Sequence, residues 1–139
     1  MFLECAWQAL EDAGYVSDTY AGNIGVFAGM NFNNYLLNNI YSNSELVQAM
    51  GVYQLSLSNA EAFLCTRTSY KLNLTGPSVA VQTACSTALV ATAMAYLNLL
   101  NYQADMALGW WCDGLVVAKN RLFISRGRRC FSRRAYPHL

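Results

Sequence analysis

The sequence predicts a single α/β domain in which two strands and a connecting buried helix surround one cysteine. The chain has 139 residues, close to the usual size of one domain. Hydrophobic residues make up 55% of it and charged residues only 12%, which excludes a disordered or low-complexity protein. Apolar residues recur at helical spacing in some segments and form short β-branched runs in others. This alternation is typical of crossover units in an α/β sheet.

The first half of the chain predicts a helix, a strand and a loop. Residues 2–13 carry apolar side chains at three- and four-residue steps, which indicates an amphipathic helix, and Gly14 is suited to end it in a left-handed conformation. Residues 23–29 are β-branched and contain glycine at their end, which favours a buried strand. Residues 31–58 are rich in Asn, Tyr and Ser, and we expect a mobile loop there with one or two short helices.

The second half predicts a strand, a helix and a strand in succession. Residues 60–72 form a second predicted helix, which ends before Gly76-Pro77. Residues 78–83 predict the second strand and residues 105–108 the start of a third. Between them, residues 86–101 are apolar on nearly every helical face, so we expect this helix to be buried on all sides.

The distribution of charge divides the chain near residue 108. Residues 1–108 hold two basic and seven acidic side chains, whereas residues 109–139 hold seven basic and one acidic. We therefore predict a domain over 1–108 followed by a basic tail of different character. One interpretation is a tail that binds nucleic acid, because arginines can contact phosphates without sequence preference. The candidate residues are Arg126, Arg128, Arg129, Arg133 and Arg134.

Cysteine and histidine usage favours a reduced, metal-free, cytoplasmic protein. The five cysteines are an odd number with wide spacing and no C-x-x-C pair, which argues against a disulfide framework. The single histidine, His138, has no neighbouring ligand at zinc-site spacing. Glu4 interrupts the apolar run that a signal peptide needs. The most apolar stretch, residues 84–100, falls slightly short of the ~20 residues of a spanning helix, so no membrane partner is expected.

The candidate site is Cys85, which the pattern places between a strand and a helix. Unpaired N–H groups and aligned peptide dipoles at a helix N-terminus favour negative charge, so a thiolate is favoured there and becomes a better nucleophile. Small neighbours, Ala84, Ser86 and Ala88, leave room for a substrate carbonyl. The Cys85 amide could donate a hydrogen bond to the oxyanion that forms. The alternative is a small buried packing residue, which free cysteines often are.

Four ordered motifs carry a resemblance to a known family. Leu74-Thr-Gly-Pro-Ser78 followed by Gln82-Thr-Ala-Cys-Ser-Thr-Ala-Leu-Val-Ala91 closely resembles the active-site segment of the β-ketoacyl synthase (ketosynthase) domain of modular type I polyketide synthases. The helix at residues 2–15 resembles the family's F-L-E-x-x-W-E-A-L-E-D-A-G-Y, with Gln8 in place of Glu. Gly25-Val-Phe-Ala-Gly29 resembles its G-V-F-x-G strand, and Arg67-Thr-Ser-Tyr70 resembles R-I-S-Y.

The resemblance implies a partial thiolase-like fold and a 3-oxoacyl-[acyl-carrier-protein] synthase activity. It implies that Cys85 accepts an acyl chain from the phosphopantetheine of an acyl carrier protein, with no cofactor bound by the chain itself. A malonyl-type extender is then decarboxylated, and its carbanion attacks the thioester in a Claisen condensation. It also implies a homodimer in the parent domain, formed through the strand at about residues 79–82.

The resemblance covers residues 1–108 and stops there. The family's two catalytic histidines belong to motifs downstream of the cysteine, and His138 lies in no such motif. We therefore expect an inactive N-terminal-half fragment of a longer gene product. Where the family continues Ala-Gly-Gly-Val, this chain has Gly109-Trp-Trp-Cys112. If Ala-Gly-Gly-Val is written GCT GGT GGT GTG and one G precedes it, the codons become GGC TGG TGG TGT, which encode Gly-Trp-Trp-Cys. Residues 109–139 are thus hypothesised to be translated out of frame.

Two further classes compete with this interpretation, besides a nucleic-acid-binding tail. One is a non-catalytic interaction subunit of thiolase-like fold, but such subunits often lack the cysteine that is present here as Cys85. The other is a condensing enzyme of fatty-acid synthesis, which uses the same machinery. These residues do not identify the acyl chain that is accepted.

Overall fold

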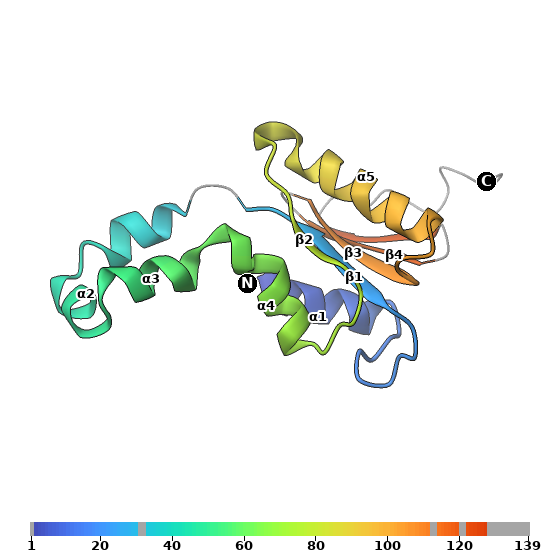
Figure 1. Ribbon diagram of the computed structural model, residues 1–139, viewed down its shortest axis with the longest axis horizontal. Coiled ribbons are helices and arrows are strands. Elements are labelled where there is room, and N and C mark those ends of the chain that lie inside the picture. The colour runs from blue at the N-terminus through green and yellow to red at the C-terminus, as the bar shows by residue number, and fades with distance from the viewer. Residues whose placement is uncertain (1, 31–32, 112–113, 120–121, 128–139) are drawn as a thin grey trace.

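The computed structural model describes residues 2–30, 33–111, 114–119 and 122–127. They form a five-stranded sheet with helices on both faces (Figure 1). In order along the sheet, the strands are β2 (Ser78–Ala80), β1 (Ile24–Ala28), β3 (Met106–Trp111), β4 (Gly114–Lys119) and β5 (Leu122–Gly127). The first three are parallel to one another, whereas β4 and β5 continue the sheet antiparallel. The predicted α/β class is thereby confirmed.

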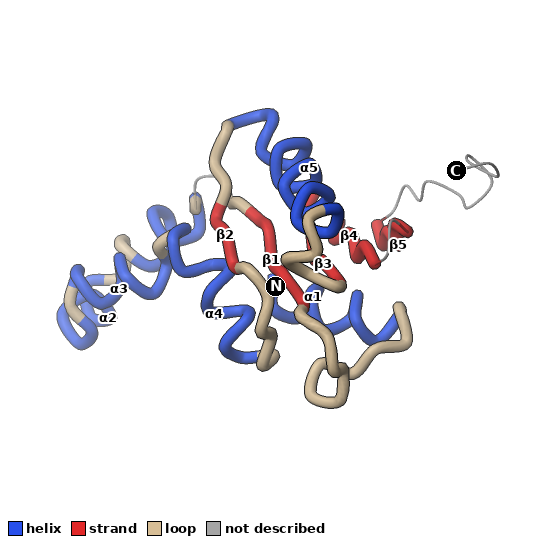
Figure 2. Tube along the Cα trace, turned by 45° about the vertical axis from the view of Figure 1, so that its right-hand side comes forward, coloured by secondary structure: helices blue, strands red, loops and turns tan. Residues whose placement is uncertain are grey.

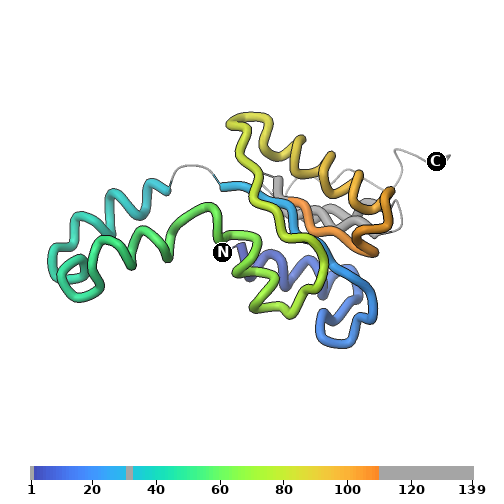
Figure 3. Tube along the Cα trace, in the orientation of Figure 1, coloured from blue at the N-terminus to red at the C-terminus, as the bar shows by residue number. Residues whose placement is uncertain are grey.

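Three helices sandwich the parallel strands. Helix α5 (Thr87–Leu100) packs on one face, against β1 and β3, and α1 (Phe2–Asp12) and α4 (Leu64–Lys71) cover the other (Figures 1 and 2). The segment between β1 and α4 forms a π-helical turn η1 (Leu36–Ile40), helices α2 (Ser44–Met50) and α3 (Val52–Asn59), and a 3-10 turn η2 (Glu61–Phe63). Helices α2 and α3 extend to one side of the sheet as an arm (Figure 3).

The alternation of side chains along the strands produces two hydrophobic clusters. In β1, Ile24, Val26 and Ala28 pack toward α1 and α4, and Phe27 packs toward α5. All five residues of β1 are buried, as expected for a central parallel strand. On the α5 side, Ala91 and Ala95 are buried in the same cluster as Ala107 of β3, so small side chains let the helix approach the sheet closely.

The predicted elements are largely confirmed. The predicted helix at residues 2–13 corresponds to α1, and Gly14 follows it with φ +77°, the left-handed conformation expected of the residue that ends it. The strand–helix–strand unit corresponds to β2, α5 and β3. The second predicted strand is shorter than expected, since β2 ends at Ala80, although the Val81 amide still donates to the Ala28 carbonyl at 2.9 Å.

One prediction about helix α5 is wrong. It is buried along a single face, formed by Ala88, Ala91, Ala95 and Leu99, and not on all sides. Leu89 is 66% exposed and Leu97 53% exposed on the opposite face. The reason is that α5 forms an outer layer on the sheet. Its apolar composition alone does not determine whether another layer of the protein covers its outer face. Across the described residues, no helix has both the length and the hydropathy needed to cross a bilayer.

Candidate active site

Cys85 lies at the carboxyl-terminal edge of the parallel strands. After β2 the chain passes the end of β1 and enters the 3-10 turn η3 (Ala84–Ser86), which leads directly into α5. Figure 1 shows this connection from β2 to α5 above the sheet. In open α/β sheets the carboxyl ends of the strands are where ligands bind. The structure thus places Cys85 where the sequence pattern predicts it, between a strand and the beginning of a long helix.

A left-handed residue presents the thiol to solvent. Ala84 has φ +51°, a conformation that costs a residue with a Cβ about 1–2 kcal/mol. The turn therefore reverses the chain sharply at the residue before the cysteine, and Cys85 is exposed. The interpretation of Cys85 as a buried packing residue is wrong for this structure. Strained backbone of this kind persists only where its surroundings hold it in place.

The hydroxyl groups of the two residues after Cys85, Ser86 and Thr87, help to hold the turn. The Thr83 amide donates to Thr87 Oγ1 at 2.9 Å, and Ser86 Oγ donates to the Thr83 carbonyl at 2.7 Å. The Thr87 hydroxyl lies 2.8 Å from the Ala84 carbonyl and 2.9 Å from Gln82 Oε1, so its single proton is donated to one of them at a time. One set of groups that fix the turn is thus supplied by the immediate neighbours of Cys85 in the sequence.

The side chain of Gln82 connects this turn to the rest of the domain. Its Oε1 accepts from the Ala84 amide at 3.0 Å, and its Nε2 donates to the Met30 carbonyl at 2.7 Å and to Glu61 Oε1 at 3.0 Å. Met30 follows β1, and Glu61 begins η2. In the sequence, Gln82 is recognisable only as part of a motif, because its partners lie 21 and 52 residues away and no local pattern brings them together.

Gly29 allows β1 and the segment after β2 to approach each other below the site. A Cβ at this position would overlap the Val81 carbonyl and come within 2.6 Å of Thr87 Cγ2. Both of those groups belong to the segment that carries Cys85. Only a residue without a side chain fits between β1 and this segment.

Gly29→Ala is therefore expected to destabilise the domain by about 1–3 kcal/mol, the usual cost of overpacking. It is also expected to displace the turn that carries Cys85. Chemical denaturation measures the loss of stability. Equal stability of the Gly29→Ala chain and the wild type would contradict the close approach described here.

Cys65 differs from Cys85 in being buried. It is buried in α4, and its thiol donates toward the Val79 carbonyl at 3.1 Å and the Ala28 carbonyl at 3.5 Å. Burial raises the pKa of the Cys65 thiol to about 11, with a smaller contribution from the Glu61 carboxylate opposed by the Ala28 hydrogen bond. Cys65 is thus a packing residue that stays protonated at neutral pH. Cys5, in α1, is partly exposed.

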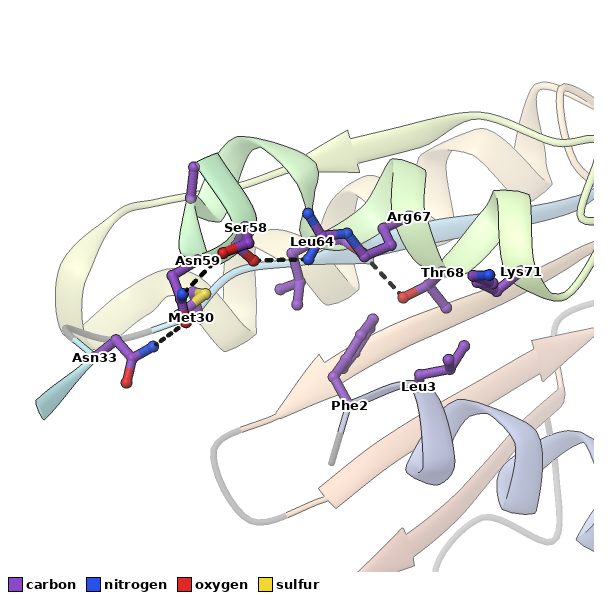
Figure 4. Close-up of a pocket in the computed structure, with 11 residues that line it drawn as sticks. Phe2, Leu3, Met30, Asn33, Ser58, Asn59, Leu64, Arg67, Thr68 and Lys71 are labelled. Atoms are coloured by element: carbon purple, nitrogen blue, oxygen red, sulfur yellow. Dashed lines mark hydrogen bonds between the residues drawn. The ribbon is translucent and has the colours of Figure 1, made fainter. Parts of the chain in front are cut away.

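A separate cavity of about 260 Å³ lies on the opposite side of the sheet from α5. It is formed by the first turn of α1, by α4 and by the end of α3 (Figure 4). Arg67 and Lys71 of α4 line it, and Arg67 Nη1 donates to the Ser58 carbonyl at 2.7 Å. Its lining does not include Cys85. No group of three or more His, Cys, Asp and Glu side chains in the described part of the chain is arranged to hold a metal ion.

Comparison with known proteins assigns the family. The model of the β-ketoacyl synthase N-terminal domain matches residues 1–133. The chain is 47% identical, over 114 residues, to a phenolphthiocerol/phthiocerol polyketide synthase of Mycobacterium tuberculosis, in an alignment that covers 78% of this chain and 8% of that protein. It is 36% identical, over 140 residues, to polyketide synthase ThaG of Burkholderia thailandensis, covering 95% of this chain and 2% of the relative. The chain therefore spans a small part of these relatives.

Solved structures agree with the fold. The ketosynthase from module 6 of the Bacillus subtilis bacillaene synthase superimposes with a TM-score of 0.57 at 36% identity, over 78% of this chain and 17% of that one. Ketosynthase twelve of the Bacillus amyloliquefaciens bacillaene synthase gives a TM-score of 0.67 at 28% identity, over 91% and 21%. The molecule is thus an α/β protein with an exposed cysteine at the edge of its parallel strands. It belongs to the β-ketoacyl synthase family, in the N-terminal part of a polyketide-synthase ketosynthase domain with the thiolase-like fold.

The comparisons bear differently on the other expectations. They do not favour a non-catalytic thiolase-like protein or a nucleic-acid-binding protein, since the relatives named above are polyketide synthases and ketosynthases. The family match continues to residue 133, past the predicted boundary at 108. The hypothesis that residues 109–139 are translated out of frame stays a prediction. His138 and four of the five arginines proposed for nucleic-acid binding, Arg128, Arg129, Arg133 and Arg134, lie outside the described residues, and Arg126 lies in β5.

Proposed function

We propose that Cys85 is the acyl acceptor of a ketosynthase site in this chain. The observation that carries the proposal is the exposure of Cys85 on a strained turn at the start of α5, beside the carboxyl ends of the parallel strands. Its position in the family's active-site motif supports the same role. The aligned peptide groups of α5 favour negative charge at this end of the helix.

The proposed first step is acyl transfer between two sulfur atoms. The Cys85 thiolate attacks the carbonyl carbon of an acyl thioester carried on the phosphopantetheine of an acyl carrier protein. A C–S bond to Cys85 forms, and the tetrahedral oxyanion is stabilised by backbone N–H groups such as that of Cys85 itself. The C–S bond to the carrier then breaks, and the phosphopantetheine sulfur leaves as a thiolate that takes up a proton. No redox cofactor takes part in this step.

The second step of the family reaction needs groups beyond this site. Loss of carbon dioxide from a malonyl thioester leaves a carbanion, which attacks the Cys85 thioester, forms a C–C bond and releases the cysteine thiolate. Decarboxylation and stabilisation of the extender thioester are the work of two histidines in the family, and this sequence contains only His138. The family to which the chain belongs transfers acyl groups. We therefore expect Cys85 of this chain to accept an acyl group, and we expect no condensation of that group with a malonyl extender.

We also propose that a second copy of the parent domain pairs along β2. This strand occupies the edge of the sheet, with β1 on its inner side and no strand of the described residues on its outer side. Ala80 is exposed there. An unpaired strand edge is a template for strand addition.

A cytoplasmic location fits substrates that are carried on acyl carrier proteins.

Loading with an acyl-pantetheine thioester tests the proposed function. The chain is expected to gain one acyl group and to release one equivalent of pantetheine thiol, and neutral hydroxylamine should remove the group, as it does from thioesters. Adding malonyl-pantetheine should yield no 3-oxoacyl product from this chain. Failure to take up any hydroxylamine-sensitive acyl group would contradict the proposal, and a condensed product would contradict the requirement for the two histidines.

A further inference from the structure

Gln82 uses every hydrogen-bonding position of its amide at the turn before Cys85. Its Oε1 accepts from the Ala84 amide and lies within hydrogen-bonding distance of the Thr87 hydroxyl. Both hydrogens of its Nε2 have an acceptor, the Met30 carbonyl and the Glu61 carboxylate. One side chain thus joins the end of β1, the start of η2 and the turn itself.

The two sides of the Gln82 amide have different roles. The nitrogen side is anchored to the carbonyl of Met30 and the carboxylate of Glu61, neither of which belongs to the turn. The oxygen side holds the amide of Ala84, the left-handed residue that directly precedes Cys85. Without that acceptor, relaxation of Ala84 toward a right-handed conformation is opposed by fewer bonds. Those that remain are the local hydroxyl bonds described above and the backbone bonds from the Ser86 amide to the Thr83 carbonyl and from the Thr87 amide to the Ala84 carbonyl. Such a relaxation would rotate both the thiol and the Cys85 amide.

We propose that Gln82 is a positioning residue that holds the Cys85 sulfur and the Cys85 amide in the orientation required for acyl transfer. The proposal rests on the proposed function, because it assigns to Gln82 an effect on acylation of Cys85. Gln82 does not react; it acts through the backbone of Ala84. Acylation depends on the orientation of the sulfur relative to an oxyanion donor, whereas alkylation by a small reagent depends mainly on access to the thiol. The two reactions therefore separate positioning from exposure.

Four chains test the proposal: wild type, Gln82→Ala, Gln82→Glu and Glu61→Gln. In Gln82→Ala the turn loses two acceptor bonds, and acylation by acyl-pantetheine is expected to fall roughly tenfold. Gln82→Glu keeps an acceptor oxygen for the Ala84 amide but places its second oxygen against the Met30 carbonyl and the Glu61 carboxylate, so acylation should fall similarly. Glu61→Gln keeps an acceptor oxygen for Gln82 Nε2 and is expected to acylate within about threefold of wild type, because the bonds from Gln82 to the turn are retained.

Three further readouts exclude a merely structural effect. Alkylation of Cys85 by iodoacetamide should change much less than acylation, and Cys65, which is buried, should stay unlabelled in every variant that remains folded. Hydrogen exchange of the peptide containing residue 84 should rise in Gln82→Ala and stay at the wild-type level in Glu61→Gln. Asn98→Ala is the matched control, since it removes an amide that bonds only to the Met94 carbonyl within α5.

The outcomes distinguish the two proposals. Acylation of Gln82→Ala at the wild-type rate, or its loss in step with exposure of Cys65, would overturn the role of Gln82. So would a fall in acylation of Glu61→Gln as large as that of Gln82→Ala, since Glu61→Gln leaves the bonds from Gln82 to the turn in place. A wild-type chain that is alkylated but never acylated would contradict the proposed function instead. In that case the exchange of the Ala84 amide alone decides the matter, and equal exchange in wild type and Gln82→Ala would overturn the positioning of the turn.

Discussion

The Cys85→Ala chain is expected to take up no acyl group from an acyl-pantetheine thioester, a loss of at least about a hundredfold in the rate of acylation. The reason is that the proposed reaction forms a covalent bond to the Cys85 sulfur, and no other described cysteine combines exposure with the start of a helix. Intact-mass measurement over time gives the rate directly. Because Cys85 is already exposed, its replacement by alanine should leave the free energy of unfolding nearly unchanged.

Cys5→Ala is the matched control for this experiment. Cys5 is partly exposed in α1, and its loss should leave the rate of acylation within about twofold of wild type, as expected for a residue outside the reaction. Residual acylation of Cys85→Ala at the wild-type rate would contradict the assignment. Acylation that disappears in Cys5→Ala and persists in Cys85→Ala would move the acceptor to α1.

The second large effect is expected in the rate at which Cys65 is alkylated. The pKa of the Cys65 thiol is raised from 9.0 to about 11, so at pH 8 only about one thiol in a thousand is ionised. Burial further hinders access of a reagent. Cys65 is therefore expected to react with iodoacetamide at pH 8 more than a hundred times more slowly than Cys85. Denaturant should remove the difference, and peptide mapping of the alkylated cysteines measures it.

The same pKa shift predicts how stability changes in alkali. The folded state holds Cys65 protonated, whereas the unfolded chain ionises with a pKa near 9.0. The stabilisation is thus fully present below pH 9 and is lost as the pH rises toward 11, with a total of roughly 2–3 kcal/mol. Denaturation at pH 7, 9 and 10.5 measures it. Cys65→Ser is not a suitable control for this measurement, because it places a hydroxyl in the apolar cluster between α4 and the sheet.

The positions of α1, β1, α5 and the start of β3 could be predicted because their signals are local, whereas β4 and β5 were not predicted. The apolar spacing of α1, the β-branched run of β1 and the glycine that ends α1 act over a few residues. The same holds for Cys85, which stands between a short strand and a long apolar helix in the sequence itself. The burial of α5 was predicted wrongly, because composition indicates how apolar a helix is and not how many layers cover it.

The Gln82 network could not be predicted, because its partners come from distant parts of the chain. Met30 and Glu61 reach Gln82 only when β1, η2 and the turn assemble on the sheet. The close contact at Gly29 has the same origin, since the Val81 carbonyl approaches it across parallel strands. Local patterns thus indicate where a nucleophile stands, and the tertiary structure determines what holds it there.

Modification by a cerulenin-type epoxide, an electrophile aimed at condensing-enzyme thiols, tests the central assignment most directly. The chain is treated with a limiting amount of reagent at neutral pH, digested and mapped by mass spectrometry. We predict that the label is found on the peptide containing Cys85 and on neither Cys5 nor Cys65. A label confined to Cys5, or one spread over all the cysteines in proportion to their exposure, would contradict the claim that the turn before α5 presents the reacting sulfur.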